Sequence, residues 1–60
     1  MKKIIIKRIS DNKKLVSVIE NGITKGFRTM AINDDRKTLA AIHLFKLKFG
    51  ILDKDIIYLL

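Results

Sequence analysis

Residues 14–31 read KLVSVIENGITKGFRTMA, with a run of apolar and β-branched residues on each side of Asn21-Gly22. Such runs are typical of strands. The dipeptide between them suits a two-residue type I′ turn, because both of its central residues take positive φ. The sequence therefore predicts an antiparallel hairpin of residues 14–20 and 23–31.

A two-residue turn also sets the register of the hairpin, and with it the face on which each side chain lies. In a regular ladder one face is expected to carry Val16, Val18 and Phe27, and the other Leu15, Ile19 and Arg28. Gly26 is expected at a bulge or at a close approach of two backbones, because an isolated Gly in a strand often marks one or the other.

On the N-terminal side, residues 2–9 are rich in Ile and predict a further strand. Residues 10–13 form a turn, because Asp and Asn tolerate left-handed backbone and bond to their own chain. Ile4 and Ile6 belong to one face of this strand, and Ile5 and Ile9 to the other. The sequence leaves open which set joins which face of the hairpin.

On the C-terminal side, residues 36–49 contain no helix breaker and predict one helix. Asn33 is the expected N-cap, and Asp34 and Asp35 suit the positive end of the helix dipole. Gly50 is the expected stop. The helix has two apolar stripes. The expected core stripe is Thr38, Ala41, Ile42, Phe45 and Phe49, and the second is Ala40, Leu44 and Leu47.

Residues 56–60 end the chain with apolar side chains, which predicts a fourth strand at the edge of the sheet. The expected structure is a single domain, residues 1–60, of the α+β class. It has a small antiparallel sheet, the order β-β-β-α-β, and one helix packed on one face.

The charge of the chain is unevenly distributed. Residues 1–30 hold eight Lys and Arg against two acidic residues, a net +6, whereas residues 31–60 hold five against four, a net +1. A one-sided positive field attracts polyanions. Lys residues also serve as ordinary solubilising groups, so this charge alone leaves a solvated surface as the alternative.

The chain carries little that indicates catalysis, so we expect no enzyme and no cofactor. There is no Cys, and His43 is the one imidazole. A structural zinc site needs four such ligands, so none is expected. Asp53 and Asp55 are too few oxygens for a calcium loop. Residues 22–26 lack the Gly-Lys-Ser/Thr ending of a phosphate loop.

The expected location is the cytoplasm. The apolar residues 4–6 are followed at once by Lys7 and Arg8, which is too short for the apolar region of a signal peptide. No apolar stretch approaches the length that crosses a bilayer, so no membrane partner is expected.

The first functional hypothesis is a small basic module that binds DNA or RNA through a sheet face. A sheet with cations and hydroxyl groups can enter a nucleic-acid groove, where the cations contact phosphates. The expected binding residues are Lys3, Lys7, Arg8, Lys14, Lys25 and Arg28. The three Phe residues are expected in the core, which disfavours base stacking on single strands.

The second hypothesis is a small phage- or plasmid-type inhibitor or an antitoxin-like protein that docks on a larger protein. Exposed apolar patches with a charged rim mark such interfaces. The expected interface is the second helix stripe, Ala40, Leu44 and Leu47, which a homodimer could also bury. Burial of this stripe within a wide helix interface is the structural alternative.

Overall fold

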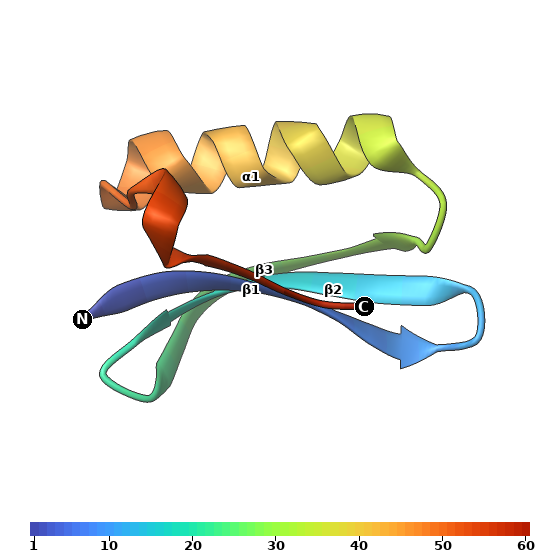
Figure 1. Ribbon diagram of the computed structural model, residues 1–60, viewed down its shortest axis with the longest axis horizontal. Coiled ribbons are helices and arrows are strands. Elements are labelled where there is room, and N and C mark those ends of the chain that lie inside the picture. The colour runs from blue at the N-terminus through green and yellow to red at the C-terminus, as the bar shows by residue number, and fades with distance from the viewer.

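A computed structural model describes residues 1–60 as four strands and one α-helix in two layers, with the helix over one face of the sheet (Figure 1). The elements in chain order are β1 (Lys2–Ser10), β2 (Lys13–Glu20), β3 (Ile23–Ala31), α1 (Asp35–Phe49), a short 3₁₀ turn (Asp53–Asp55) and β4 (Ile56–Leu59). The predicted α+β class and the order β-β-β-α-β are confirmed.

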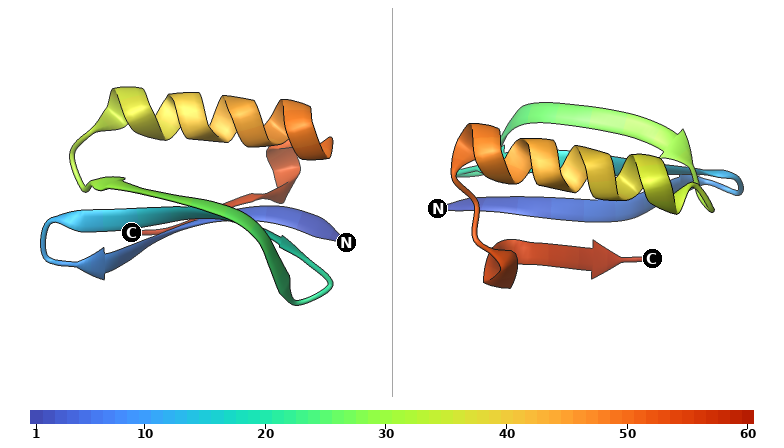
Figure 2. Two further views of the ribbon diagram at one scale, coloured as in Figure 1. Left: turned by 180° about the vertical axis from the view of Figure 1, so that it is seen from behind. Right: turned by 90° about the horizontal axis from the view of Figure 1, so that it is seen from above.

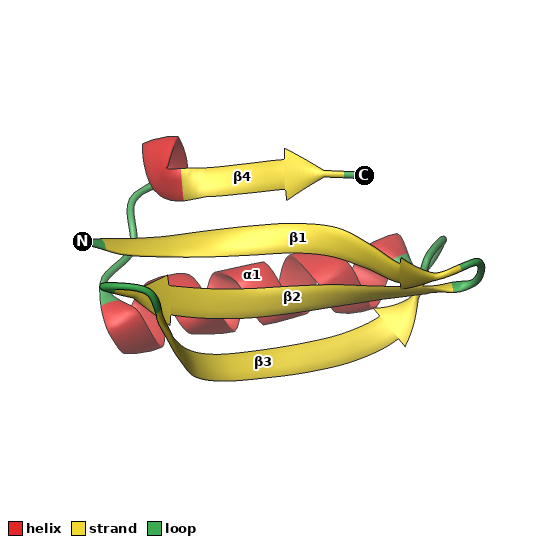
Figure 3. Cartoon of the chain, turned by 90° about the horizontal axis from the view of Figure 1, so that it is seen from below, coloured by secondary structure: helices red, strands yellow, loops and turns green.

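The strands lie in the order β3-β2-β1-β4 (Figure 3). β1, β2 and β3 pair in antiparallel fashion, whereas β4 pairs parallel to β1, with Ile4 opposite Ile56. The sheet is therefore mixed rather than wholly antiparallel. The chain leaves β3 at one edge, crosses the sheet as α1 and returns as β4 at the other edge (Figure 2).

The turn between β2 and β3 has the predicted form. Asn21 has φ 54° and Gly22 has φ 83°, and Glu20 lies opposite Ile23. Positive φ at two successive residues is the requirement of the type I′ turn, which is why Asn and Gly occupy these positions.

A bulge three residues after the turn exchanges the two faces of β3. The register shifts there, so that Val18 lies opposite Gly26 and Lys25 is the extra residue. One inserted residue moves every following side chain to the opposite face. Arg28 consequently shares the helix-covered face, and Phe27 shares the open one. The predicted placement of these two side chains was wrong.

Gly26, the residue after the bulge, lies beneath the aromatic end of the helix. A Cβ atom at Gly26 would lie 3.5 Å from Cε1 of Phe45 and 3.7 Å from Cε2 and Cζ of Phe49. The two rings are in contact range of one another, with centroids 6.1 Å apart. The bulge therefore puts a residue without a side chain directly beneath the aromatic end of α1.

The hydrophobic core lies between α1 and the sheet. Thr38, Ala41, Ile42 and Phe45 are buried and Phe49 is half-buried, so the predicted core stripe of the helix is confirmed. The buried apolar residues are Ile4, Ile6, Val16, Val18, Met30, Ala41, Ile42, Phe45 and Ile51. On the sheet side, alternation along β1 and β2 leaves the other set of side chains facing away from α1.

Both ends of α1 are capped. The side chain of Asp34 accepts a hydrogen bond from the backbone N–H of Lys37 at 3.0 Å, so the N-cap is Asp34 and not Asn33 as predicted. Gly50 has φ 68°, and its N–H donates to the carbonyl of Lys46, as expected of a left-handed stop.

Replacing Asp34 by Ala is expected to lower the free energy of unfolding by about 1 kcal/mol, because an N–H of the first helical turn loses its partner. Asn33→Ala is the matched control, since the Asn33 side chain makes no capping bond. Urea denaturation followed by circular dichroism compares the two. An equal loss in both variants would show that the cap is wrongly placed.

Candidate nucleic-acid interface

The face of the sheet opposite α1 has no element over it (Figure 3). We call this the open face. Its side chains follow from the register of the four strands and include Lys3, Ile5, Lys7, Lys13, Leu15, Ser17, Ile19, Thr24, Phe27, Thr29, Ile57 and Leu59. Antiparallel sheets commonly expose one face, and that face is normally polar. This one is partly apolar, which favours a binding surface.

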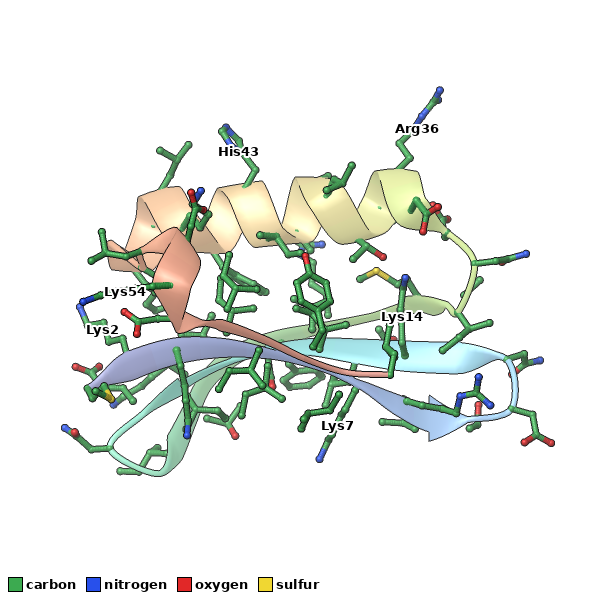
Figure 4. The ribbon with its side chains drawn as sticks, in the orientation of Figure 1. Lys2, Lys7, Lys14, Arg36, His43 and Lys54 are labelled. Atoms are coloured by element: carbon green, nitrogen blue, oxygen red, sulfur yellow. The ribbon has the colours of Figure 1, made fainter.

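Three lysines give the open face a uniform charge. Lys3 and Lys7 stand on β1 on either side of Ile5, and Lys13 begins β2. With a rise of about 3.3 Å per residue, the Cα atoms of Lys3 and Lys7 are about 13 Å apart. Figure 4 shows Lys7 pointing away from the helix. No Asp or Glu stands at an open-face position of the four strands, so the charged side chains there are all positive.

Phe27 is the aromatic residue of the open face and is 64% exposed. It borders a shallow cavity of 290 Å³ that Lys7 and Thr24 also line. The apolar floor consists of Ile5, Leu15 and Ile19. An aromatic ring beside a cation and a hydroxyl group is suited to stacking on a planar group.

Ser17 lies at the base of this cavity and is buried. Its hydroxyl group donates to the carbonyl of Ile5 at 3.4 Å. The hydroxyl is therefore bound within the sheet, and Thr24 and Thr29, which are exposed, are the hydroxyl groups that a ligand can reach.

The structure brings only part of the predicted nucleic-acid set together. Lys3 and Lys7 lie on the open face, and Lys25 is exposed at the bulge. Arg8 and Arg28 are exposed but belong to the helix side of the sheet, since their partners are Lys14 and Val16.

Lys14 is the predicted binding residue with the least exposure. It is 3% exposed and points toward the helix side (Figure 4). It occupies a position between Arg8 and Met30 in the sheet. Its stem packs in the interior, so it contributes nothing to the open face.

Lys13 and the exposed Phe27 are open-face residues that differ from the sequence prediction. The sequence predicts Lys13 in the turn before β2. Its signal was available, because counting back by two from Leu15 places Lys13 on the same face. The exposure of Phe27 depends on the bulge at Lys25, and the alternation of side chains along a regular strand does not predict that bulge.

The second apolar stripe of α1 is exposed. Leu44 is 43% and Leu47 72% exposed, and Ala40 is exposed as well. The alternative that the helix buries this stripe is therefore wrong. Ala40 and Leu44 also line a groove of 550 Å³ between α1 and β3, which Leu47 does not reach.

His43 lies on the outer surface of α1, away from the sheet (Figure 4). Nearby on the flank of the helix, Lys46 forms an ion pair with Asp53 and ties α1 to the turn before β4. No three His, Cys, Asp or Glu side chains gather in an arrangement that could hold a metal ion.

The helix α1 is neither long enough nor apolar enough to cross a bilayer. Comparison of the chain with protein-family models, with curated proteins and with solved structures gives no match. The open face and the groove beside β3 are the two surface features of the fold that are suited to binding a partner.

Proposed function

We propose that this protein is a binding module for nucleic acid and that the open face is its interface. The observation that carries the proposal is the composition of that face, which combines Lys3, Lys7 and Lys13 with an exposed Phe27 and no carboxylate. Lysines attract and position phosphates without reading sequence. The bases meet the apolar and aromatic part of the surface.

The exposed ring favours single strands over a duplex. Four-stranded sheets with surface aromatics are one of the recurring platforms on which unpaired bases stack. Every base has a π-face, so a stacking surface accepts DNA and RNA of many sequences. The expectation that all three Phe residues lie in the core was the ground for disfavouring single strands, and the position of Phe27 removes it.

An NMR titration of isotope-labelled protein tests where nucleic acid binds. A single-stranded DNA, a single-stranded RNA and a duplex DNA of mixed sequence serve as probes. The expected result is that amide shifts concentrate around Lys3, Lys7, Lys13 and Phe27, and stay small along the outer surface of α1. Shifts centred on α1, or none with any probe at low salt, would contradict the proposal.

Replacing Phe27 by Ala is expected to weaken single-strand binding by about 1–3 kcal/mol, roughly 5- to 150-fold, because one stacked base loses its platform. Duplex binding should change little. Phe27→Tyr keeps the ring and should bind like the parent. Fluorescence anisotropy measures the affinities of the parent, the Phe27→Ala variant and the Phe27→Tyr variant. Equal losses in the Ala and Tyr variants would argue against stacking.

A second candidate function is docking on a protein, as in a phage- or plasmid-type inhibitor or an antitoxin-like protein. The exposure of Leu44 and Leu47 beside Ala40 favours it, because contiguous exposed apolar side chains are a feature of protein interfaces. Nucleic-acid binding uses the open face and protein docking uses the outer surface of α1, so point mutations distinguish the two functions. Leu47→Ser should leave nucleic-acid binding unchanged.

A further inference from the structure

The outer edge of β3 is free to pair with another strand. β3 is the last strand in the order β3-β2-β1-β4, so its backbone N–H and C=O groups on the outer side have no partner strand. Such an edge is a template for an added strand. With nine residues, Ile23–Ala31, it is long enough to align a peptide of average strand length.

A groove runs along this edge, between β3 and α1. It has a volume of 550 Å³, and Phe27 to Met30 form its β3 side. Ala40, Ala41 and Leu44 form its apolar α1 side. The small Ala side chains leave the space that a residue of an added strand would fill. This combination of a free strand edge and an apolar helix flank is what strand-addition recognition requires.

The charges of the groove select the partner. Arg28 from β3 and Lys37 from α1 line it, and no carboxylate does. Lys25 adds a further exposed cation at the bulge of the same edge strand. An acidic segment would meet complementary charge here, which provides specificity and a faster approach.

A second copy of this chain is a poor occupant of the groove. Pairing β3 with β3 would bring the cations Lys25 and Arg28 of one copy against those of the other, and like charges across an edge oppose pairing. The net charge of +7 adds a general repulsion between copies.

We propose that an extended acidic segment of a partner protein adds to β3 as a fifth strand. Its backbone pairs with the outer edge of β3. Its acidic side chains meet Arg28 and Lys37, and an apolar side chain enters the groove beside Ala40 and Leu44. This site adjoins the open face, with which it shares Phe27 and Thr29, and its helix side and its ligand go beyond the nucleic-acid function.

The probe for this site is a peptide of about six residues that alternates glutamate and valine, the length of an average strand. The expected result in an NMR titration is a set of amide shifts along residues 27–30 and on the adjoining turns of α1. A peptide with lysine in place of glutamate should produce none. A peptide N-methylated at alternate residues, on the amides that would face β3, should lose binding.

Two variants test separately how the charge and the shape of the groove contribute to peptide binding. Arg28→Glu is expected to weaken peptide binding at least about tenfold, because it places a like charge against the acidic segment. Ala40→Phe fills the groove without changing charge and should also abolish binding. The matched controls are Lys7→Glu on the open face and Leu39→Phe on the other flank of α1, which should bind the peptide as the parent does.

The outcomes distinguish this proposal from the nucleic-acid function. Ala40→Phe should keep oligonucleotide binding while losing the peptide. No shifts with the acidic peptide, shifts confined to the open-face residues of β1 and β2, or a concentration-dependent dimer paired through β3 would each overturn the proposal. The three peptide and dimer results do not depend on whether the open face binds nucleic acid.

Discussion

Replacing Phe45 by Ala is expected to lower the free energy of unfolding by about 3–5 kcal/mol. Phe45 is 5% exposed, and its ring lies beside the ring of Phe49 and next to Gly26. A domain of this size has a total stability of only about 3–9 kcal/mol, because it buries a small share of its surface. We therefore expect a substantially unfolded population at 37 °C.

Urea denaturation monitored by circular dichroism measures this loss. Leu47→Ala is the matched control, because Leu47 lies on the same helix but is 72% exposed. Its cost should stay within about 0.5 kcal/mol, as for most surface positions. Equal costs for the two variants would mean that α1 does not pack on the sheet through the stripe that contains Phe45.

Reversing two charges of the open face, in the double variant Lys3→Glu and Lys7→Glu, is expected to reduce nucleic-acid affinity by at least about 100-fold at low salt. Nonspecific binding is essentially electrostatic, so the loss of two phosphate contacts and the gain of two repulsions both act against it. The fold should persist, because neither lysine belongs to the buried core. Fluorescence anisotropy with a single-stranded oligonucleotide gives the affinities.

The control must change net charge by the same amount elsewhere. Arg36→Glu combined with Lys54→Glu does so, since both side chains are exposed and lie away from the open face (Figure 4). This variant should lose far less affinity than the open-face variant. Equal losses would show that the overall charge of the protein, and not the open face, determines binding.

Much of the fold could be predicted because local chemistry specifies it. Asn21-Gly22 specifies the turn, since few other dipeptides accept positive φ twice. The spacing of the stripe from Thr38 to Phe49 identifies the face of α1 that packs on the sheet. The end of the helix at Gly50 follows from the same preference for a left-handed residue.

The candidate site was harder to predict, because it depends on a single inserted residue. Alternation counted from the turn places Arg28 on the open face and Phe27 in the core, and the bulge at Lys25 reverses both. The register shift is seen only in the folded sheet, where Gly26 lies under the rings of Phe45 and Phe49. Gly26 is the one residue that indicates a bulge in this strand, but it does not indicate whether the extra residue comes before or after it.

The burial of Lys14 and the direction of β4 have the same kind of origin. A lysine in a strand is normally expected at the surface, yet pairing places Lys14 beside Met30 on the helix side. The parallel pairing of β4 with β1 follows from the route of α1 across the sheet. Residues 56–60 alone predict neither the route of α1 across the sheet nor the parallel pairing of β4 with β1.

The salt dependence of oligonucleotide binding tests the central proposal most directly. If Lys3, Lys7 and Lys13 each contact one phosphate, the logarithm of the binding constant should fall with the logarithm of salt concentration with a slope of about −2 for a single strand and about −3 for a duplex. In the variant that reverses Lys3 and Lys7 only the Lys13 contact remains, so the slope should shrink to about −0.7 for a single strand and about −0.9 for a duplex. A parent protein that does not bind at low salt, or that binds with no salt dependence, would contradict the proposal that the open face is a nucleic-acid interface.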